Sequence, residues 1–231
     1  PKDGSPITIP TQDMILGCYY LTQEGTEDRS TAQDKGDGKI FTDIDEMIMA
    51  YRNKDVGLHA KVKVRMFKDK DDKRGHLVES TVGRFIFNEK IPQDLGFVKD
   101  READPYSLEI DFLVKKGELG DIIDKCYRKH GNTKTALMLD YIKDISYHYS
   151  TKSAITISVS DMVVPEEKDA IIADADALVD KYEEASNNGL VSEKERYEKV
   201  IDIWAKTTDK VADALMDSLD PLNNLNIMAT S

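Results

Sequence analysis

The chain has 231 residues, enough for one large or two small domains with their own hydrophobic cores. Its 44 acidic and 32 basic side chains give a net charge of −12, which argues against free-standing nucleic-acid binding because such a surface repels phosphates. No apolar run approaches the roughly 20 residues that span a bilayer, and no signal peptide opens the sequence. We therefore expect no membrane contact and a cytoplasmic location.

The cysteines and histidines lack the spacing of a metal site. Cys18 and Cys126 stand alone, without a Cys-x-x-Cys pair, and the four histidines are scattered along the chain. We expect two reduced thiols, no metal and no cofactor in this segment.

The stretch Pro6–Gly17 reads PITIPTQDMILG. Its β-branched residues 7–9 predict a short strand that Pro10 ends, because proline offers no ladder donor. Thr11, Gln12 and Asp13 then separate two apolar runs. Their spacing predicts that Asp13 or Thr11 caps a short helix over residues 14–16.

The next hundred residues alternate between loop, helix and strand patterns. Residues 23–39 are polar and glycine-bearing and predict a surface loop, and residues 42–52 begin with a capping pattern that predicts a helix. Residues 58–66 alternate apolar and charged side chains, which predicts a half-buried strand. Residues 80–88, STVGRFIFN, predict a second strand, joined to the first by a hairpin loop over residues 69–75.

Helical periods dominate from about residue 108. One helix is expected over residues 120–129 and another from about 133 to just before Ser150, followed by a short strand over residues 154–159. Beyond Pro165, apolar residues recur at alternating steps of four and three, which predicts two long helices that face each other. The expected facing positions are Ile171, Ala175, Leu178, Tyr182 and Ala185 on the first helix, and Tyr197, Ile201, Trp204, Thr208, Val211 and Leu215 on the second.

The link between these helices predicts an antiparallel pair. Asn187, Asn188 and Gly189 tolerate a positive φ, and Ser192 with Glu195 forms a capping box. The predicted fold class is α+β, a small mixed β-rich base with helices followed by a long antiparallel helical hairpin. The predicted domains are a β-rich region (1–107), a helical region (108–164), the hairpin (165–219) and a tail (220–231).

Catalytic signals are weak. The glycine-rich KGDGK at residues 35–39 lacks the spacing of a phosphate-binding loop and predicts a flexible loop, and the acidic pairs lie on outer hairpin faces without a cleft. These features favour a scaffold that presents a surface to partners. One hypothesis is an independent cytoplasmic helical-hairpin adaptor for protein–protein interaction.

Several motifs resemble the family of bacterial RNA polymerase beta-prime subunits. They are PITIPTQDMILGCYYLT, GLHAKVKVR (residues 57–65), TVGRFIFNEKIP (81–92), SAITISVSDMVVPEEK (153–168) and GLVSEKERYEKVIDIW (189–204), in the same order as in the family. The resemblance extends over nearly the whole chain, and it implies a nucleotidyltransferase parent protein in which this segment walls the secondary channel. It also implies that the hairpin forms the rim of that channel, where transcript-cleavage factors bind.

The resemblance also implies roles for particular residues. Pro10, Thr11, Gln12 and Asp13 would line the catalytic cavity, and the rim would present Asp180, Glu183, Glu184, Glu195, Arg196, Glu198 and Lys199 to docking factors. The family's catalytic metal loop would precede Pro1 and its trigger element would follow Ser231, so we expect the segment alone to be inactive. The implied partners are the alpha, beta, omega and sigma subunits, with DNA and RNA bound only through the complete enzyme. Magnesium and zinc are expected elsewhere in the parent subunit.

Two family sites for a guanosine tetraphosphate alarmone are altered here. A lysine, an aspartate and a tyrosine of the first site fall on Thr133, Asp140 and Asp144, so only the aspartate is kept. An asparagine of the second site falls on Glu198. We therefore expect neither alarmone site to be retained.

Overall fold

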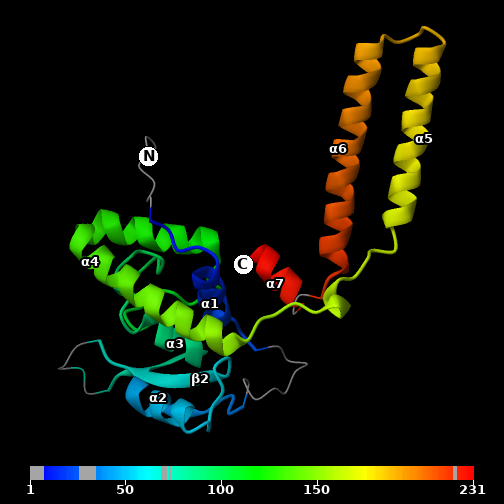
Figure 1. Cartoon of the computed structure of the whole chain (residues 1–231). Coiled ribbons are helices and arrows are strands. Elements are labelled where there is room, and N and C mark those ends of the chain that lie inside the picture. The colour runs from blue at the N-terminus through cyan, green and yellow to red at the C-terminus, as the bar shows by residue number, and fades with distance from the viewer. Residues whose placement is uncertain (1–7, 26–34, 69–71, 73, 221–222) are drawn as a thin grey trace. The chain divides into compact units, whose positions relative to one another are not determined.

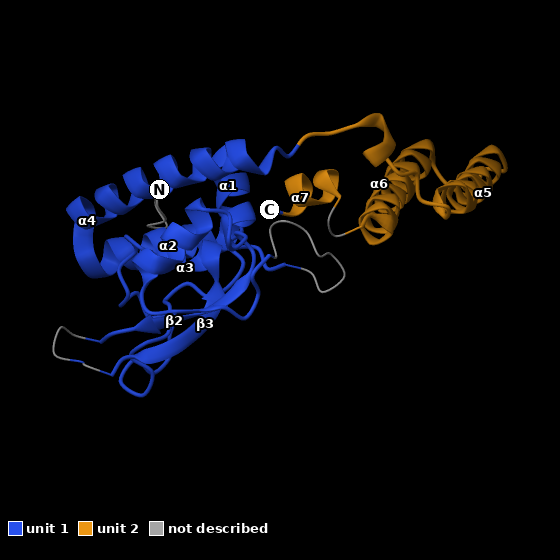
Figure 2. Ribbon diagram, turned by 90° about the horizontal axis from the view of Figure 1, so that it is seen from below, with its two compact units in different colours: residues 1–155, 231 blue, residues 156–230 orange. Residues whose placement is uncertain are grey.

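The structure is a computed structural model that describes residues 8–25, 35–68, 72, 74–220 and 223–231 (Figure 1). It divides into two compact units, unit 1 with residues 1–155 and 231, and unit 2 with residues 156–230 (Figure 2). Unit 1 combines a small sheet with helices, and unit 2 contains a helical hairpin. The predicted α+β class with a helical hairpin is confirmed.

The sheet of unit 1 has three strands in the order β1 (Ile40–Phe41), β2 (Lys61–Met66) and β3 (His76–Thr81). β1 is parallel to β2, and β2 is antiparallel to β3 with Lys61 opposite Thr81. The predicted alternation along residues 58–66 is confirmed, because Ala60, Val62 and Val64 are buried and share one face. Most of the expected hairpin loop between β2 and β3 lies outside the described residues.

The predicted second strand is wrong in its position and in most of its length. Residues 80–81 do belong to β3, but the chain then forms helix α3 (Val82–Asn88). The Thr81 hydroxyl accepts a hydrogen bond from the Arg84 N–H at 3.2 Å and so caps this helix. Every residue of α3 is buried, so the helix has no polar face to reveal its period.

Helix α1 (Asp13–Thr22) is a central element of unit 1, beside helix α4 (Lys116–Ser153) (Figure 1). Two glycines allow close approach. A Cβ atom on Gly17 would lie 1.9 Å from the Ser146 carbonyl oxygen of α4, and one on Gly83 of α3 would lie 1.9 Å from the Leu21 carbonyl oxygen of α1. Backbone therefore packs directly on backbone on both sides of α1.

The two helices expected over residues 120–129 and 133–149 are the two arms of α4. The arms meet at Gly131, whose φ of 73° and ψ of −175° interrupt the helical backbone. Only glycine adopts such angles readily, and this accounts for the bend. α4 ends where Ala154 takes a left-handed conformation, with φ 50° and ψ 32°.

The strands expected over residues 7–9 and 154–159 are not formed in the described residues. Residue 7 lies outside the described part, and residues 8–10 have no regular structure. Residues 155–158 are irregular and lead into a 3-10 turn, η1 (Val159–Asp161). Among the described residues, neither run pairs with a strand, so their β-branched residues alone do not make a sheet.

The remaining part of unit 1 is held by side chains bonded to backbone. The carboxylate of Asp43 caps helix α2 (Ile44–Arg52) by accepting from the Glu46 N–H at 2.7 Å. The buried amide of Asn88 accepts from the Ile110 N–H at 3.0 Å and donates to the Ile110 carbonyl at 2.8 Å. The Asn88 side chain thus satisfies both backbone hydrogen-bonding groups of Ile110, in the irregular segment between α3 and α4, as a neighbouring strand would.

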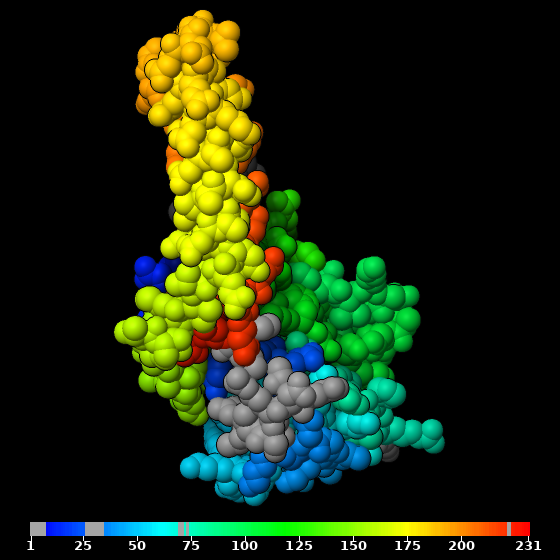
Figure 3. All heavy atoms as spheres, turned by 90° about the vertical axis from the view of Figure 1, so that its right-hand side faces the viewer, coloured from blue at the N-terminus to red at the C-terminus, as the bar shows by residue number. Residues whose placement is uncertain are grey.

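Unit 2 contains an antiparallel pair of helices, α5 (Lys168–Asn187) and α6 (Glu193–Ser218), and a short helix α7 (Asn224–Thr230). The link behaves as predicted, with Gly189 at φ 70° and a capping box between Ser192 and Glu195. Figure 3 shows the hairpin from the α5 side.

The predicted register of α6 is wrong by about one residue over most of its length. Tyr197, Ile201 and Trp204 are 62%, 51% and 37% exposed, whereas Thr207 is buried. The less exposed stripe of α6 runs through Arg196, Val200, Ile203, Thr207 and Val211. On α5, Ala175 is buried as expected, but Leu178 is 46% exposed.

Candidate functional site

The polar entry to α1 joins a buried proline to three exposed side chains. Pro10 is buried, while Thr11, Gln12 and Asp13 are exposed. The expectation that Asp13 or Thr11 caps the helix is wrong, because the N-cap position belongs to Gln12, which makes no side-chain capping bond. The three polar side chains are therefore not used to start the helix and remain available at the surface of unit 1.

The backbone of Gln12 is strained. Its φ of 51° and ψ of −122° lie in a region that residues other than glycine rarely occupy, and such strain costs on the order of 1–3 kcal/mol. The Gln12 carbonyl accepts from the N–H groups of Ile15 and Leu16 at 3.0 and 3.1 Å, which holds the turn in place. Strain of this kind, kept in an exposed polar motif, is typical of a site where a side chain must point in one direction.

At the tip of the hairpin, several of the charged side chains predicted to dock a factor form ion pairs or caps within the hairpin. Arg196 binds Glu193 on its own helix and lies 3.8 Å from the carboxylate of Glu183 on α5. The Ser192 N–H donates to Glu195, which lowers the pKa of that carboxyl. Glu198 lies 3.8 Å from Lys194.

Three of the predicted rim residues remain without an ion pair among the described residues, namely Asp180, Glu184 and Lys199. Asp180 and Glu184 are exposed and four residues apart, so they share one face of α5. The structure therefore separates the rim set into residues bound up at the tip and an open acidic pair on α5.

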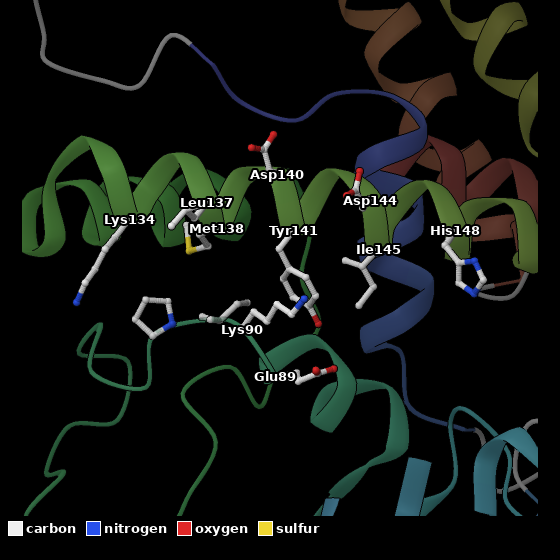
Figure 4. Close-up of a pocket in the computed structure, with 12 residues that line it drawn as sticks. Glu89, Lys90, Lys134, Leu137, Met138, Asp140, Tyr141, Asp144, Ile145 and His148 are labelled. Atoms are coloured by element: carbon white, nitrogen blue, oxygen red, sulfur yellow. The ribbon is translucent and has the colours of Figure 1, made fainter. Parts of the chain in front are cut away.

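A groove of about 960 Å³ lies on unit 1, between α4 and the chain that follows α3 (Figure 4). Tyr141 extends from α4 across the groove, and its hydroxyl donates to the Ile86 carbonyl at 2.6 Å. The ammonium of Lys90 lies 5.3 Å from the centre of the Tyr141 ring. Burial raises the pKa of Tyr141, so this phenol acts as a neutral donor.

Asp140 and Asp144 line the edge of this groove. Figure 4 shows both carboxylates on the side of α4 away from Glu89 and Lys90. Each lies within ion-pair distance of Lys143, at 3.3 and 3.5 Å. The family resemblance points to these two aspartates, but no sequence pattern points to Lys90 and Tyr141, because a cation over a ring joins residues far apart in the chain.

Among the described residues, the side chains that could bind a metal or act as a nucleophile include histidines, cysteines and acidic residues. Nowhere in that part of the chain do three or more histidine, cysteine or acidic side chains gather as they would around a metal ion. Both thiols are buried, and burial raises the pKa of Cys18 to about 12, so it is not a nucleophile at neutral pH. In the described ranges, no helix is both long and apolar enough for a membrane span.

Comparison with known proteins gives one family along most of the chain. The family model of RNA polymerase Rpb1, domain 3, matches residues 1–162. The whole chain is similar to part of the protein named DNA-directed RNA polymerase subunit beta' in Clostridioides difficile strain 630, at 61% identity over 233 residues. It is 62% and 53% identical to the proteins of the same name in Alkaliphilus oremlandii and Clostridium acetobutylicum. In each case the chain is covered fully but spans 19% of the relative.

Proposed function

The chain belongs to the RNA polymerase Rpb1 domain 3 family, and from that membership we propose that it is a segment of the large catalytic subunit of a bacterial DNA-directed RNA polymerase. The observation that carries the proposal is similarity over the full chain at 61% identity to one such subunit. The parent protein would transfer nucleotides to a growing RNA in the cytoplasm. Its partners would be the alpha, beta, omega and sigma subunits.

Within that enzyme we propose a structural and docking role for this segment. Unit 1 would wall the secondary channel, and the hairpin would form its rim. By the same family resemblance, the catalytic magnesium and the zinc of the parent subunit would lie in other segments. Phosphoryl transfer depends on such ions to stabilise the charge of the transferred group.

The flanking gene sequence tests this proposal against an independent adaptor. By the family resemblance, the catalytic metal loop has the sequence NADFDGD, and NIMATS at residues 226–231 would continue into GARG. A polymerase segment requires codons for the first motif upstream and for the second downstream in one reading frame, and an adaptor requires neither. Primer extension gives a biochemical test. We expect the 231-residue chain alone to remain at the no-protein background, and incorporation above that background would contradict the proposal.

We further propose that Gln12 contributes its side chain to the lining of the catalytic cavity, with Pro10, Thr11 and Asp13 beside it. The strained backbone and the exposed side chain of Gln12 support this role. The test is nucleotide incorporation by complete polymerase carrying Gln12→Gly or Gln12→Ala. Glycine accepts the backbone angles and alanine does not, but both remove the amide. Loss in both variants supports a side-chain role, and loss in the alanine variant alone reduces Gln12 to a backbone role.

For the rim, we propose that the open acidic pair Asp180 and Glu184 attracts transcript-cleavage factors that carry basic or mixed patches. Glu183, Glu195, Arg196, Glu198 and Lys199 would form the rest of the docking surface. Exposed charges of this kind act mainly on the rate of encounter.

The rim proposal is tested by stopped-flow association of a cleavage factor with complete polymerase. Asp180→Lys with Glu184→Lys should slow association at low salt, and the difference should shrink at high salt. The matched control is Asp213→Lys with Asp217→Lys, an exposed acidic pair of α6 far from the turn in sequence. Equal rates for both double variants and wild type would rule out the docking role while leaving the family assignment intact.

A further inference from the structure

Unit 1 contains a second cavity, of about 430 Å³, which the proposed function does not use. It is formed by α1, the turn before β1, the end of α2 with the loop that follows, and the last turn of α4. The described residues of its lining include three lysines and two tyrosines but no acidic residue: Tyr20, Lys35, Tyr51, Lys54, Val56, Gly57, Leu58 and Lys152.

The carboxylates of the described residues do not neutralise the three lysines. The Lys35 ammonium donates to the Lys54 carbonyl at 2.8 Å, and the Lys152 ammonium lies 5.5 Å from the centre of the Tyr51 ring. No carboxylate within the described ranges forms an ion pair with Lys35, Lys54 or Lys152. Elsewhere six lysines do bind carboxylates: Lys61, Lys63, Lys129, Lys143, Lys194 and Lys206. In a chain of net charge −12, three cations around one cavity, none of them paired with a described carboxylate, make a local positive site.

Lys54 lies in a turn whose backbone conformation is unusual for lysine. Lys54 has a φ of 62°, a left-handed conformation that is uncommon for lysine. Its N–H donates to the Tyr51 carbonyl at 3.0 Å, and the next N–H, of Asp55, donates to Ala50 at 2.9 Å. These two hydrogen bonds hold the backbone of the turn that places Lys54 in the cavity lining.

From this arrangement we propose that the cavity binds a small phosphate-bearing molecule. Lys35, Lys54 and Lys152 bind its phosphate oxygens as point charges, and the rings of Tyr20 and Tyr51 contact its remaining part. The volume lies within the range of about 300–1,000 Å³ that small-molecule sites occupy, and this favours a nucleotide-sized ligand over a nucleic-acid strand. The inference rests on the geometry of unit 1 alone and does not depend on the proposed function.

The competing explanation is that the lysines serve the helix ends. Lys152 lies in the last turn of α4, and Lys54 follows the end of α2, where cations complement the helix dipole. In that role the lysines would stabilise the folded protein and bind no ligand. Measuring phosphate binding by folded lysine variants therefore distinguishes the two explanations.

The test is isothermal titration of the 231-residue chain with sodium tripolyphosphate at low ionic strength. We expect saturable binding with one site per chain, weakened at least about tenfold by Lys54→Gln or Lys152→Gln. The matched control is Lys116→Gln in the first turn of α4, an exposed lysine outside the cavity, which should bind as wild type does. Circular dichroism melting confirms that each variant is folded before titration.

A second titration, with a nucleoside triphosphate, tests the tyrosine contacts. Binding tighter than tripolyphosphate that falls to the tripolyphosphate level in Tyr51→Ala supports them. The proposal is overturned if wild type shows no saturable heat with either compound, or if Lys54→Gln, Lys152→Gln and Lys116→Gln bind tripolyphosphate equally.

Discussion

Unit 1 and unit 2 cover their apolar side chains to different extents. In unit 1 a continuous buried cluster reaches from Ile15 in α1 to Tyr149 in α4 and takes in the sheet and α3. In the described part of unit 2 the buried hydrophobic residues are Ala175, Leu219 and Ile227. Large side chains there remain open to solvent, with Val159 90% and Leu190 78% exposed.

This contrast indicates what stabilises each unit. Burial can hold unit 1 together, since each fully covered aliphatic or aromatic side chain contributes about 1.5–3 kcal/mol. Few apolar side chains are buried between α5 and α6, and we call this narrow interface the seam of the hairpin. The hairpin must therefore depend more on caps, helix propensity and contacts beyond the chain. Exposed apolar side chains are typical of surfaces that meet a partner, which supports the proposal that unit 2 belongs to a larger assembly.

The largest effect is expected where helices of unit 1 touch through their backbones. Gly17→Ala would place a Cβ 1.9 Å from the Ser146 carbonyl oxygen, which belongs to backbone and cannot rotate away. We expect a loss of about 3 kcal/mol in the free energy of unfolding of unit 1. Hydrogen exchange of α1 and α4 amides measures it.

The control for this variant is Gly120→Ala, because a Cβ at Gly120 of α4 meets no atom within 4 Å. Alanine there should be neutral or stabilise by up to about 1 kcal/mol. If Gly17→Ala is as well tolerated as Gly120→Ala, the close contact between α1 and α4 is wrong.

A second effect concerns the pH dependence of unit 1. Burial raises the pKa of Cys18 from 9.0 to about 12, so the folded state keeps the neutral thiol. The stabilisation is complete below pH 9 and is lost as pH rises from 9 toward 12, because the unfolded chain releases the proton first. At pH 10.5 we expect a loss of ~2 kcal/mol from this group.

Urea unfolding of wild type and Cys18→Ala, followed through unit 1 amides between pH 8 and 11, isolates this contribution. Tyr19 and Tyr149 also have a pKa raised by burial, but both are present in the two proteins and cancel in the difference. The pKa of Tyr141 is raised by burial and in part by the charge of Cys18, so that coupling belongs to the Cys18 difference. The wild-type curve should fall more steeply with pH, and parallel curves would show that Cys18 is not sealed from water.

Residues with a clear local signal were predicted correctly from the sequence. The alternation of β2, the Ser192 capping box and the turn at Gly189 each depend on neighbours within a few positions. The seven residues of α3 carry no such signal, because a helix buried on every side loses its polar period and its β-branched and aromatic residues resemble a strand.

The hairpin register failed for a related reason. Apolar residues occupy two adjacent stripes of α6, one through Ile201 and Trp204 and the other through Val200 and Ile203. Periodicity alone cannot decide which stripe faces α5. The candidate sites differ in the same way. The rim charges lie close together in sequence and could be predicted from it, whereas the cavity lysines come from distant parts of the chain and could not.

A smaller effect is expected at the start of α6. The Ser192 hydroxyl accepts from the Glu195 N–H, and Glu195 accepts in return from the Ser192 N–H. Ser192→Ala should cost about 1 kcal/mol in the stability of unit 2. Trp204 is the single tryptophan of the chain, so its fluorescence reports unit 2 during urea unfolding.

Ser218→Ala is the matched control, because that hydroxyl donates to the Leu215 carbonyl at the other end of the helix and caps no N–H group. Its midpoint should stay at the wild-type value. Equal midpoints for Ser192→Ala and wild type would indicate that the cap contributes nothing to the hairpin.

The smallest change in the free energy of unfolding is expected for Ile201→Ala. This variant tests which face of α6 packs against α5. Ile201 is 51% exposed, so little burial is lost, and alanine has the higher helix propensity. The two contributions nearly cancel, and we expect a change within about 0.5 kcal/mol.

Ile203, two residues on, lies on the less exposed stripe, and Ile203→Ala should cost about 2 kcal/mol through lost contacts with the seam. Both variants remove the same atoms from the same helix, so their difference depends only on which side faces α5. Tryptophan fluorescence during urea unfolding measures both, and a larger loss for Ile201→Ala than for Ile203→Ala would restore the register that periodicity alone predicts.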